Sequence, residues 1–215
     1  MEEKLNQLAE YVISGKKFET EKLTKELIEE NVNVKEILDN GLLKGMEVVG
    51  QRFRDHKMFV PQVLVSARAM HSAMKILEPL LIAEDMKKKG KIMIGTVFGD
   101  VHDIGKNLVS IMLKGAGYDV IDIGTGCNAQ KFFIEYEKHK PDVIGMSALL
   151  TTTMTNMKSV IQYFKEKEVS VPFIVGGAPI NQKFALDIGA AGYGKDAYDA
   201  VKLMDSLMDN NGTDF

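Results

Sequence analysis

Several common features are scarce or absent in this sequence of 215 residues. Its single cysteine, Cys127, excludes any disulfide within the chain. There is no tryptophan, and no apolar run approaches the roughly 18 residues that a membrane-spanning helix needs. The N-terminus lacks the features of a secretory signal peptide. Together these absences predict a protein of the cytoplasm.

The excess of charge of one sign is also small. The formal net charge is -3, which gives no reason to expect nucleic acid or an anionic membrane as a partner. The basic run 87–89 adjoins a glycine, and we interpret it as a solvated linker because blocks of like charge repel one another into solvent. A hydrophobic content of 45% with 27% charged residues is typical of a globular protein of one large or two modest domains.

Residues 2–83 show helical periodicity and no convincing strand. We interpret Thr20 as the N-cap of a second helix and Pro61 as a first-turn residue of a fourth. Four helices joined by short turns predict a small bundle. The apolar residues repeat at helical spacing within 5–13, 23–28, 37–53 and 63–81.

Three glycines, Gly41, Gly45 and Gly50, fall inside the third predicted helix. Each costs about 1 kcal/mol relative to alanine in a helix interior. Close contact with a neighbouring helix, or with a ligand, would explain their presence.

From Lys91 onward, apolar runs typical of buried strands alternate with helical patterns. This alternation predicts a parallel sheet with right-handed crossovers, and five strands favour the flavodoxin-like order 2-1-3-4-5. Residues 84–90 are charged and patternless, so we predict a helical cap domain over 1–83, a linker over 84–90 and an α/β domain over 91–215. We predict strands at 92–98, 118–123, 143–146, 173–175 and 190–193, and helices at 104–114, 129–139, 153–168, 181–186 and 196–208.

The loop Gly99–Gly105 joins the first predicted strand to the helix that follows it, and it carries His102 between Asp100 and Asp103. Ligands of open α/β sheets bind at the carboxyl ends of strands. Side chains two residues apart point the same way in extended backbone, so Asp100 can hold one ring nitrogen of His102 while the other nitrogen binds a metal. A lone loop histidine is more often a solvated side chain, and its place at the first strand end favours the ligand interpretation.

Glycines also follow the fourth and fifth strands, at Gly176–Gly177 and within 192–194. Glycine lets a ligand approach the backbone closely, so these positions indicate a long slot that suits an extended ligand. Turn formation is the alternative explanation for any one of them. Ser147, Thr151 and Thr153 follow the third strand and can hydrogen-bond such a ligand, although helix capping explains either threonine equally well.

The stretch Gly124–Ala129 fits the dinucleotide-binding fingerprint G-x-G-x-x-A between a strand and a helix. The next strand, 142–148, ends without the acidic residue that would hold a ribose, so dinucleotide binding is disfavoured. The histidines and Cys127 form no spaced zinc motif, and the sequence has no phosphate-binding loop of the P-loop type.

Three of these segments together resemble a known family. Asp100–Gly105, Ser147–Leu149 and Gly176–Gly177 match, in order and spacing, the D-x-H-x-x-G, S-x-L and G-G signature of cobalamin-binding domains. The resemblance implies that His102 binds cobalt in place of the cofactor's own lower base and that Asp100 holds the far nitrogen of His102. The family has a His-Asp-Ser relay at this site, and Thr153 takes the place of its serine. It implies further cofactor contacts from Val101, Asp103, Ile104, Gly105, Ser147, Leu149, Thr151, Gly176, Gly177 and Ala197.

The first half of the chain carries a second resemblance. Residues 39–46 and 57–70 are similar to the four-helix cap that precedes this domain in cobalamin-dependent methionine synthase. The resemblance implies that the cap covers the upper face of the corrin through Phe53, Val60 and Val63. Asn40 departs from the pattern, because methionine synthase carries a cofactor-contacting glutamate there.

The same two modules stand alone in the corrinoid proteins of methyltransferase systems, and the resemblance covers nearly the whole chain. It implies a methyl carrier: cob(I)alamin accepts a methyl group from a substrate-specific methyltransferase, and a second methyltransferase passes it to tetrahydrofolate or to a thiol such as coenzyme M. A reductive activase is a further expected partner. The donor stays open among methylamines, betaines, methanol and methoxyaromatics.

Two alternatives compete with the methyl carrier. The first is a non-catalytic cobalamin sensor or store; a sensor would usually carry an output domain, and none is expected here. The small cobalamin-binding subunit of a mutase shares the D-x-H-x-x-G motif but would not need the cap.

Overall fold

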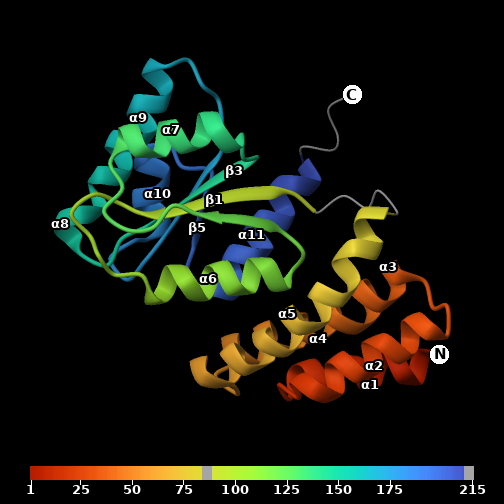
Figure 1. The fold of residues 1–215 in the computed structure, drawn as a ribbon. Coiled ribbons are helices and arrows are strands. Elements are labelled where there is room, and N and C mark those ends of the chain that lie inside the picture. Colours follow the sequence, from red (N-terminus) through yellow and green to blue (C-terminus); the bar gives the residue numbers. More distant parts are fainter. Residues whose placement is uncertain (84–88, 211–215) are drawn as a thin grey trace. The chain divides into compact units, whose positions relative to one another are not determined.

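The computed structural model describes residues 1–83 and 89–210, and Figure 1 shows its elements. The chain divides into two compact units, one helical and one α/β. Most of the predicted linker, residues 84–88, lies outside the described residues. The domain limits at residues 83 and 91 therefore stay a prediction.

The first unit is the expected four-helix bundle, with a π-helical segment inside its third helical run. Within residues 1–83 and 89–210, no helix has both the length and the apolar character needed to cross a bilayer. The elements of this unit are α1 (Glu2–Ile13), α2 (Lys17–Glu29), α3 (Val34–Glu36), the π-helical η1 (Ile37–Leu43), α4 (Lys44–Arg54) and α5 (Val60–Ala83).

Several helices begin after a side chain that caps their free backbone N–H groups. The side-chain oxygens of Asn33, Asn128 and Asn181 accept N–H groups of the first turns that follow them. The predicted cap at Thr20 is wrong, because α2 begins at Lys17 and the Thr20 hydroxyl donates to the Lys16 carbonyl instead.

Gly41 and Gly45 lie where the third helical run packs closely against α1. A Cβ atom on Gly41 would lie 2.6 Å from Leu8 Cδ2. A Cβ atom on Gly45 would lie 2.9 Å from both the Ala9 carbonyl oxygen and Val12 Cβ. Close helix contact, rather than a ligand, therefore explains both glycines.

We expect Gly45→Ala to lower the free energy of unfolding of the helical unit by about 1–3 kcal/mol, because a backbone carbonyl cannot move aside for the new methyl group. The gain of about 1 kcal/mol in helix propensity works against this loss. Gly105→Ala is the matched control, since its Cβ atom would meet no described atom within 4 Å. Urea unfolding measures both variants, and equal midpoints would contradict the packing argument.

The second unit contains a five-stranded, fully parallel sheet in the order β2-β1-β3-β4-β5, which confirms the flavodoxin-like prediction. Its strands are β1 (Lys91–Thr96), β2 (Asp119–Asp122), β3 (Val143–Ser147), β4 (Phe173–Gly176) and β5 (Gly192–Gly194). Its helices are α6 (Ile104–Gly115), α7 (Ala129–His139), α8 (Thr151–Met154), α9 (Asn156–Glu166), α10 (Gln182–Ile188) and α11 (Ala197–Asn210). The single helix expected over 153–168 is thus divided at Thr155.

Helices α7, α9 and α10 cover one face of the sheet, and α6 and α11 cover the other (Figure 1). Successive residues of a strand face opposite sides, so each strand contributes to both layers. The core under α7, α9 and α10 includes Met93, Val97, Phe132, Ile144, Met146, Met157, Phe164, Phe173, Val175 and Ile188.

The opposite face carries a level row of small residues at the carboxyl edge of the sheet. Thr96 pairs with Ser147, Ser147 with Gly176, and Gly176 with Gly194. Along each strand, these positions alternate with the residues that point into the core under α7, α9 and α10. The four residues therefore face the side of the sheet that α6 and α11 cover. The row leaves this part of the sheet without bulky side chains.

Candidate functional site

The Asp100 side chain is fully buried and lies at the centre of a hydrogen-bond network. Its Oδ1 accepts the backbone N–H of His102 at 3.1 Å and lies 2.7 Å from the ring Nδ1. Its Oδ2 accepts the Thr153 hydroxyl at 2.7 Å and the N–H groups of Leu149 and Leu150 at 2.8 and 3.3 Å. One carboxylate thus joins the loop after β1 to the loop after β3.

These contacts fix the charge of Asp100. Burial alone would raise the pKa of this carboxyl group, but the hydrogen bonds from the Leu149 N–H, the Thr153 hydroxyl and His102 together hold the pKa well below its usual range. An ionised carboxylate only accepts hydrogen bonds, so the Nδ1 of His102 carries the proton. The lone pair of the imidazole is then on Nε2.

Thr153 serves this network rather than the helix end. The N-cap position of α8 is Leu150, which makes no side-chain capping bond, so the alternative that Thr151 or Thr153 caps the helix is wrong. The Thr153 hydroxyl is closer to Asp100 than to the Leu150 carbonyl, at 2.7 against 3.1 Å.

His102 presents its free nitrogen outward. The side chain is 47% exposed, and Nε2 has no hydrogen-bond partner among residues 1–83 and 89–210. The backbone is held from behind, because the Thr96 hydroxyl donates to the His102 carbonyl at 3.0 Å. The imidazole is therefore oriented by buried groups while one nitrogen stays available.

Apolar side chains are exposed on the loops that flank His102. Val101 and Ile104 are 75% and 77% exposed, and Phe98, Leu149 and Leu150 are also exposed. Exposed apolar clusters mark binding sites. The prediction included Val101, Ile104 and Leu149 but missed Phe98 and Leu150, because an apolar run does not reveal which of its members face solvent.

The structure gives a different reason for glycine at each position of the predicted slot. A Cβ atom on Gly105 would meet nothing within 4 Å among the described residues, so the start of α6 leaves room for a ligand. Gly177 has φ +130°, and a Cβ atom there would lie 1.8 Å from the Ala148 carbonyl oxygen. The backbone itself therefore requires Gly177, whereas Gly176 faces the Gly194 carbonyl at the edge of the small-residue row.

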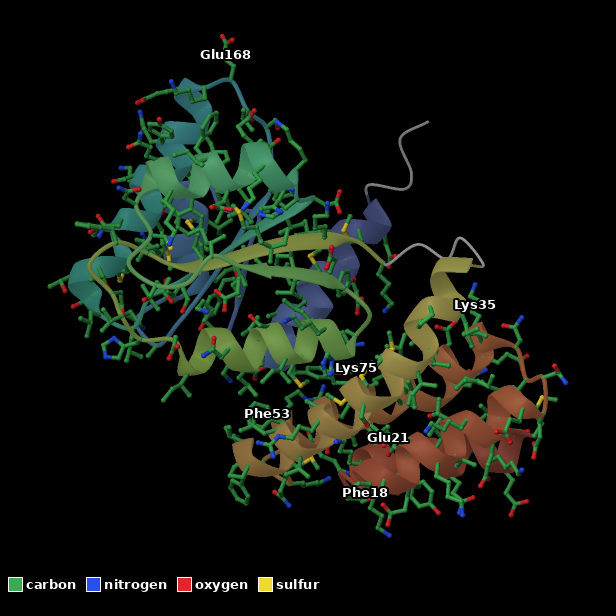
Figure 2. The ribbon with its side chains drawn as sticks, in the orientation of Figure 1. Phe18, Glu21, Lys35, Phe53, Lys75 and Glu168 are labelled. Atoms are coloured by element: carbon green, nitrogen blue, oxygen red, sulfur yellow. The ribbon has the colours of Figure 1, made fainter. Side chains whose placement is uncertain are left out.

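The remaining predicted residues occupy several environments. Asp103 is half-buried, and its backbone carbonyl accepts the Asn107 N–H at 2.7 Å in the first turn of α6. Ala197 is buried as the first residue of α11. In the helical unit, Phe53 lies half-buried in the last turn of α4 (Figure 2), Val60 is half-buried at the start of α5, and Val63 is fully buried.

Two cavities, of about 360 and 740 Å³, lie away from these loops. The smaller one is lined by Phe173 and the turn after α9, and the larger one by Tyr118 and α11. Both adjoin the amino ends of strands, and neither includes a predicted site residue. The candidate site is instead an open edge formed by loops.

The donor set fits a metal that arrives in its own macrocycle. In the described part of the chain, no group of three or more histidine, cysteine or acidic side chains could hold a free metal ion. A single imidazole, with Nδ1 on a carboxylate and Nε2 free, suits a metal whose other positions are already filled. The exposed apolar residues and the space beside Gly105 suit a large, flat ring. These features fit a corrinoid and define the class as a corrinoid-binding protein.

Comparison with known proteins gives the same class. A family model described as "B12 binding domain" matches residues 90–202, and a second model with that description matches residues 4–78. The chain belongs to this B12-binding family, among the stand-alone corrinoid proteins of methyltransferase systems.

Relatives match over nearly their full length. A corrinoid protein of Desulfitobacterium hafniense is 41% identical over 209 residues, which cover 95% of this chain and 97% of that protein. The dimethylamine corrinoid protein of Methanosarcina barkeri is 41% identical over 210 residues, covering 96% and 98%. The methanol:cobalamin methyltransferase complex of Methanosarcina barkeri contains a chain with TM-score 0.84 and 31% identity, covering 96% of this chain and 80% of that one.

We expect Asp100→Asn to lower the free energy of unfolding by about 1–3 kcal/mol at pH 7, because an amide brings N–H donors against groups that already donate. The folded pKa of Asp100 is depressed, so its contribution is present above about pH 4 and is lost as the pH falls below the ordinary aspartate pKa. The difference from wild type, measured by urea unfolding, should therefore be smaller at pH 3 than at pH 7.

The control is Asp187→Asn, whose exposed pair with Lys183 should contribute little at either pH. A difference for Asp100→Asn that is unchanged between pH 7 and pH 3 would contradict the assigned ionisation.

Proposed function

We propose that this chain is a methyl-carrying corrinoid protein, which holds cobalamin or a related corrinoid between a substrate-specific methyltransferase and a second methyltransferase. The observation that carries the proposal is the His102 imidazole, whose Nδ1 lies on the buried Asp100 carboxylate and whose Nε2 is free. Membership of the B12-binding family supports the same conclusion.

In this proposal, His102 would hold the cobalt of a bound corrinoid through Nε2. The bound corrinoid supplies a cobalt centre that accepts a methyl group and gives it up again. Asp100 holds the Nδ1 proton, and Thr153 and the Leu149 N–H hold Asp100. Because these bonds do not involve Nε2, they would hold the orientation of the His102 ring whether or not Nε2 is bound to a metal.

The small-residue row would receive the nucleotide tail of the cofactor once His102 has displaced its base. Ser147 and Thr151 would hydrogen-bond this tail, with Gly176 and Gly177 beside it and Ala197 near its end. The support is the register that places Ser147 and Gly176 at one level of the sheet.

The corrin itself would lie on the loop after β1. Val101, Asp103, Ile104, Gly105 and Leu149 are the proposed contacts. The exposure of Val101, Ile104 and Leu149, and the open space at Gly105, support this assignment.

For the upper face of the corrin, we propose contacts from Phe53, Val60 and Val63 of the helical unit. Phe53 and Val60 have exposed surface for such a contact. Val63 is buried, so its side chain reaches a ligand only if its neighbours move.

The relatives support a methyltransferase as a partner. One solved relative is part of a methanol:cobalamin methyltransferase complex, and others are dimethylamine and trimethylamine corrinoid proteins. We therefore propose a cytoplasmic protein that serves a methyltransferase for a methylated amine, a second methyltransferase that removes the methyl group, and a reductive activase.

We expect the wild-type protein loaded with cobalamin to show the base-off/His-on absorption spectrum at neutral pH. His102→Gly should bind cobalamin with a base-off spectrum instead, and added imidazole should partly restore the nitrogen-ligated form. His139→Ala is the control, since His139 pairs with Glu135 on α7 and should not affect the spectrum. An unchanged spectrum for His102→Gly would reject the ligand assignment.

Methyl transfer separates a carrier from a sensor or store. With cobalamin reduced to cob(I)alamin, we expect a methylamine methyltransferase and its methylated amine to convert the spectrum to that of methylcobalamin. Monomethylamine, dimethylamine, trimethylamine, methanol, a betaine and a methoxyaromatic compound, each with a matching methyltransferase, identify the donor. Failure with every donor, in a protein that binds cobalamin with His102 on cobalt, would refute the carrier and favour the store.

A further inference from the structure

Lys106 is a buried cation in the first turn of α6. Its side chain is 2% exposed, and its Nζ forms an ion pair with Asp122 and a 3.0 Å hydrogen bond to Asn107 Oδ1. Asp122 is the last residue of β2, and its other oxygen accepts the Gly124 N–H at 2.8 Å. The pair therefore ties the beginning of α6 to the end of β2.

The rest of the first turn of α6 is exposed. Of residues 104–107, only Lys106 is buried. Ile104 is 77% exposed, and Gly105 adjoins open space among the described residues. The first turn of α6 therefore has little apolar packing of its own, and the ion pair is its attachment to the sheet.

Stability alone does not explain a buried lysine at this position. Removing an ammonium group from water costs several kcal/mol, and apolar side chains of similar size often serve folding as well or better. A charged pair instead sets a fixed distance and direction between two elements. Because Lys106 lies four residues after His102, this fixed geometry also limits where the His102 loop can lie.

The loop after β2 braces the same region from the backbone side. The Thr96 N–H donates to the Gly124 carbonyl at 2.9 Å, and the Cys127 N–H donates to the Thr96 carbonyl at 2.9 Å. The Gly126 N–H donates to the Asp100 carbonyl at 3.0 Å. The stretch Gly124–Ala129, which fits the dinucleotide fingerprint, thus hydrogen-bonds to the backbone of the residues that precede His102.

We propose that Lys106 and Asp122 are a positioning pair for the cobalt ligand. The His102 loop is held at one end by Asp100, which is tied to the loop after β3, and at the other end by Lys106, which is tied to β2. Together with the Thr96 hydroxyl, which donates to the His102 carbonyl, these two ties would fix the position of Nε2. This inference rests on the proposed role of His102.

The test is Lys106→Met, which keeps the length of the side chain and removes its charge. With cobalamin bound, the equilibrium constant for ligation of His102 to cobalt should fall on the order of tenfold, as for the loss of an outer partner of a metal ligand. The measurements are the base-off to His-on ratio in the absorption spectrum and the axial-nitrogen splitting in the electron paramagnetic resonance spectrum of the cob(II)alamin form. Lys183→Met, which breaks the exposed pair with Asp187 on α10, should leave both unchanged.

A second readout needs no cofactor. In the unloaded protein, Lys106→Met should speed amide hydrogen exchange at Gly126 and Asp100, and Lys183→Met should not. If the methionine variant does not fold, Lys106→Gln replaces it, because glutamine keeps a donor toward Asp122 without the charge.

Wild-type ligation and wild-type exchange in a folded Lys106 variant would overturn the positioning role. A wild-type protein that binds cobalamin without a nitrogen ligand would instead refute the proposed role of His102. The exchange measurement would then still decide whether the pair fixes the loop.

Discussion

The site depends on one buried charge, the carboxylate of Asp100. A carboxylate without exposed surface persists only when enough donors surround it, and the donors come from the loop after β1, the loop after β3 and the first turn of α8. The same hydrogen bonds that hold its pKa low also hold the ring of His102 in one tautomer. The same set of hydrogen bonds therefore orients the histidine ring and joins the two loops.

The parallel sheet makes this possible with few specialised residues. All five strands end at one edge, so residues more than forty positions apart in sequence reach the same carboxylate. A corrinoid brings most of the ligands of its own cobalt, so under the proposed function a single imidazole would be enough to complete them. The rest of the edge supplies space and apolar surface, through glycine at Gly105 and side chains such as Val101 and Ile104.

Patterns that repeat along the chain were predicted well. Strand order, helical bundle and the strand-end loops follow from periodicity, because burial of an apolar face controls each element. Predictions of where a helix begins or divides were less accurate, because neighbouring residues compete for those positions. Thr20 is not a cap, because α2 begins earlier, at Lys17, and the run predicted over 153–168 divides at Thr155 because α8 forms a separate turn.

By itself, the sequence determined the relation between Asp100 and His102, because two residues in one short loop are within reach of each other in almost any fold. Only the tertiary structure decided what holds them. The other partners of the Asp100 carboxylate lie 49 to 53 residues away, and Lys106 meets Asp122 across 16 residues. Such pairs leave no local pattern, since their spacing in sequence is set by the length of the intervening helices and loops and their spacing in space by the sheet.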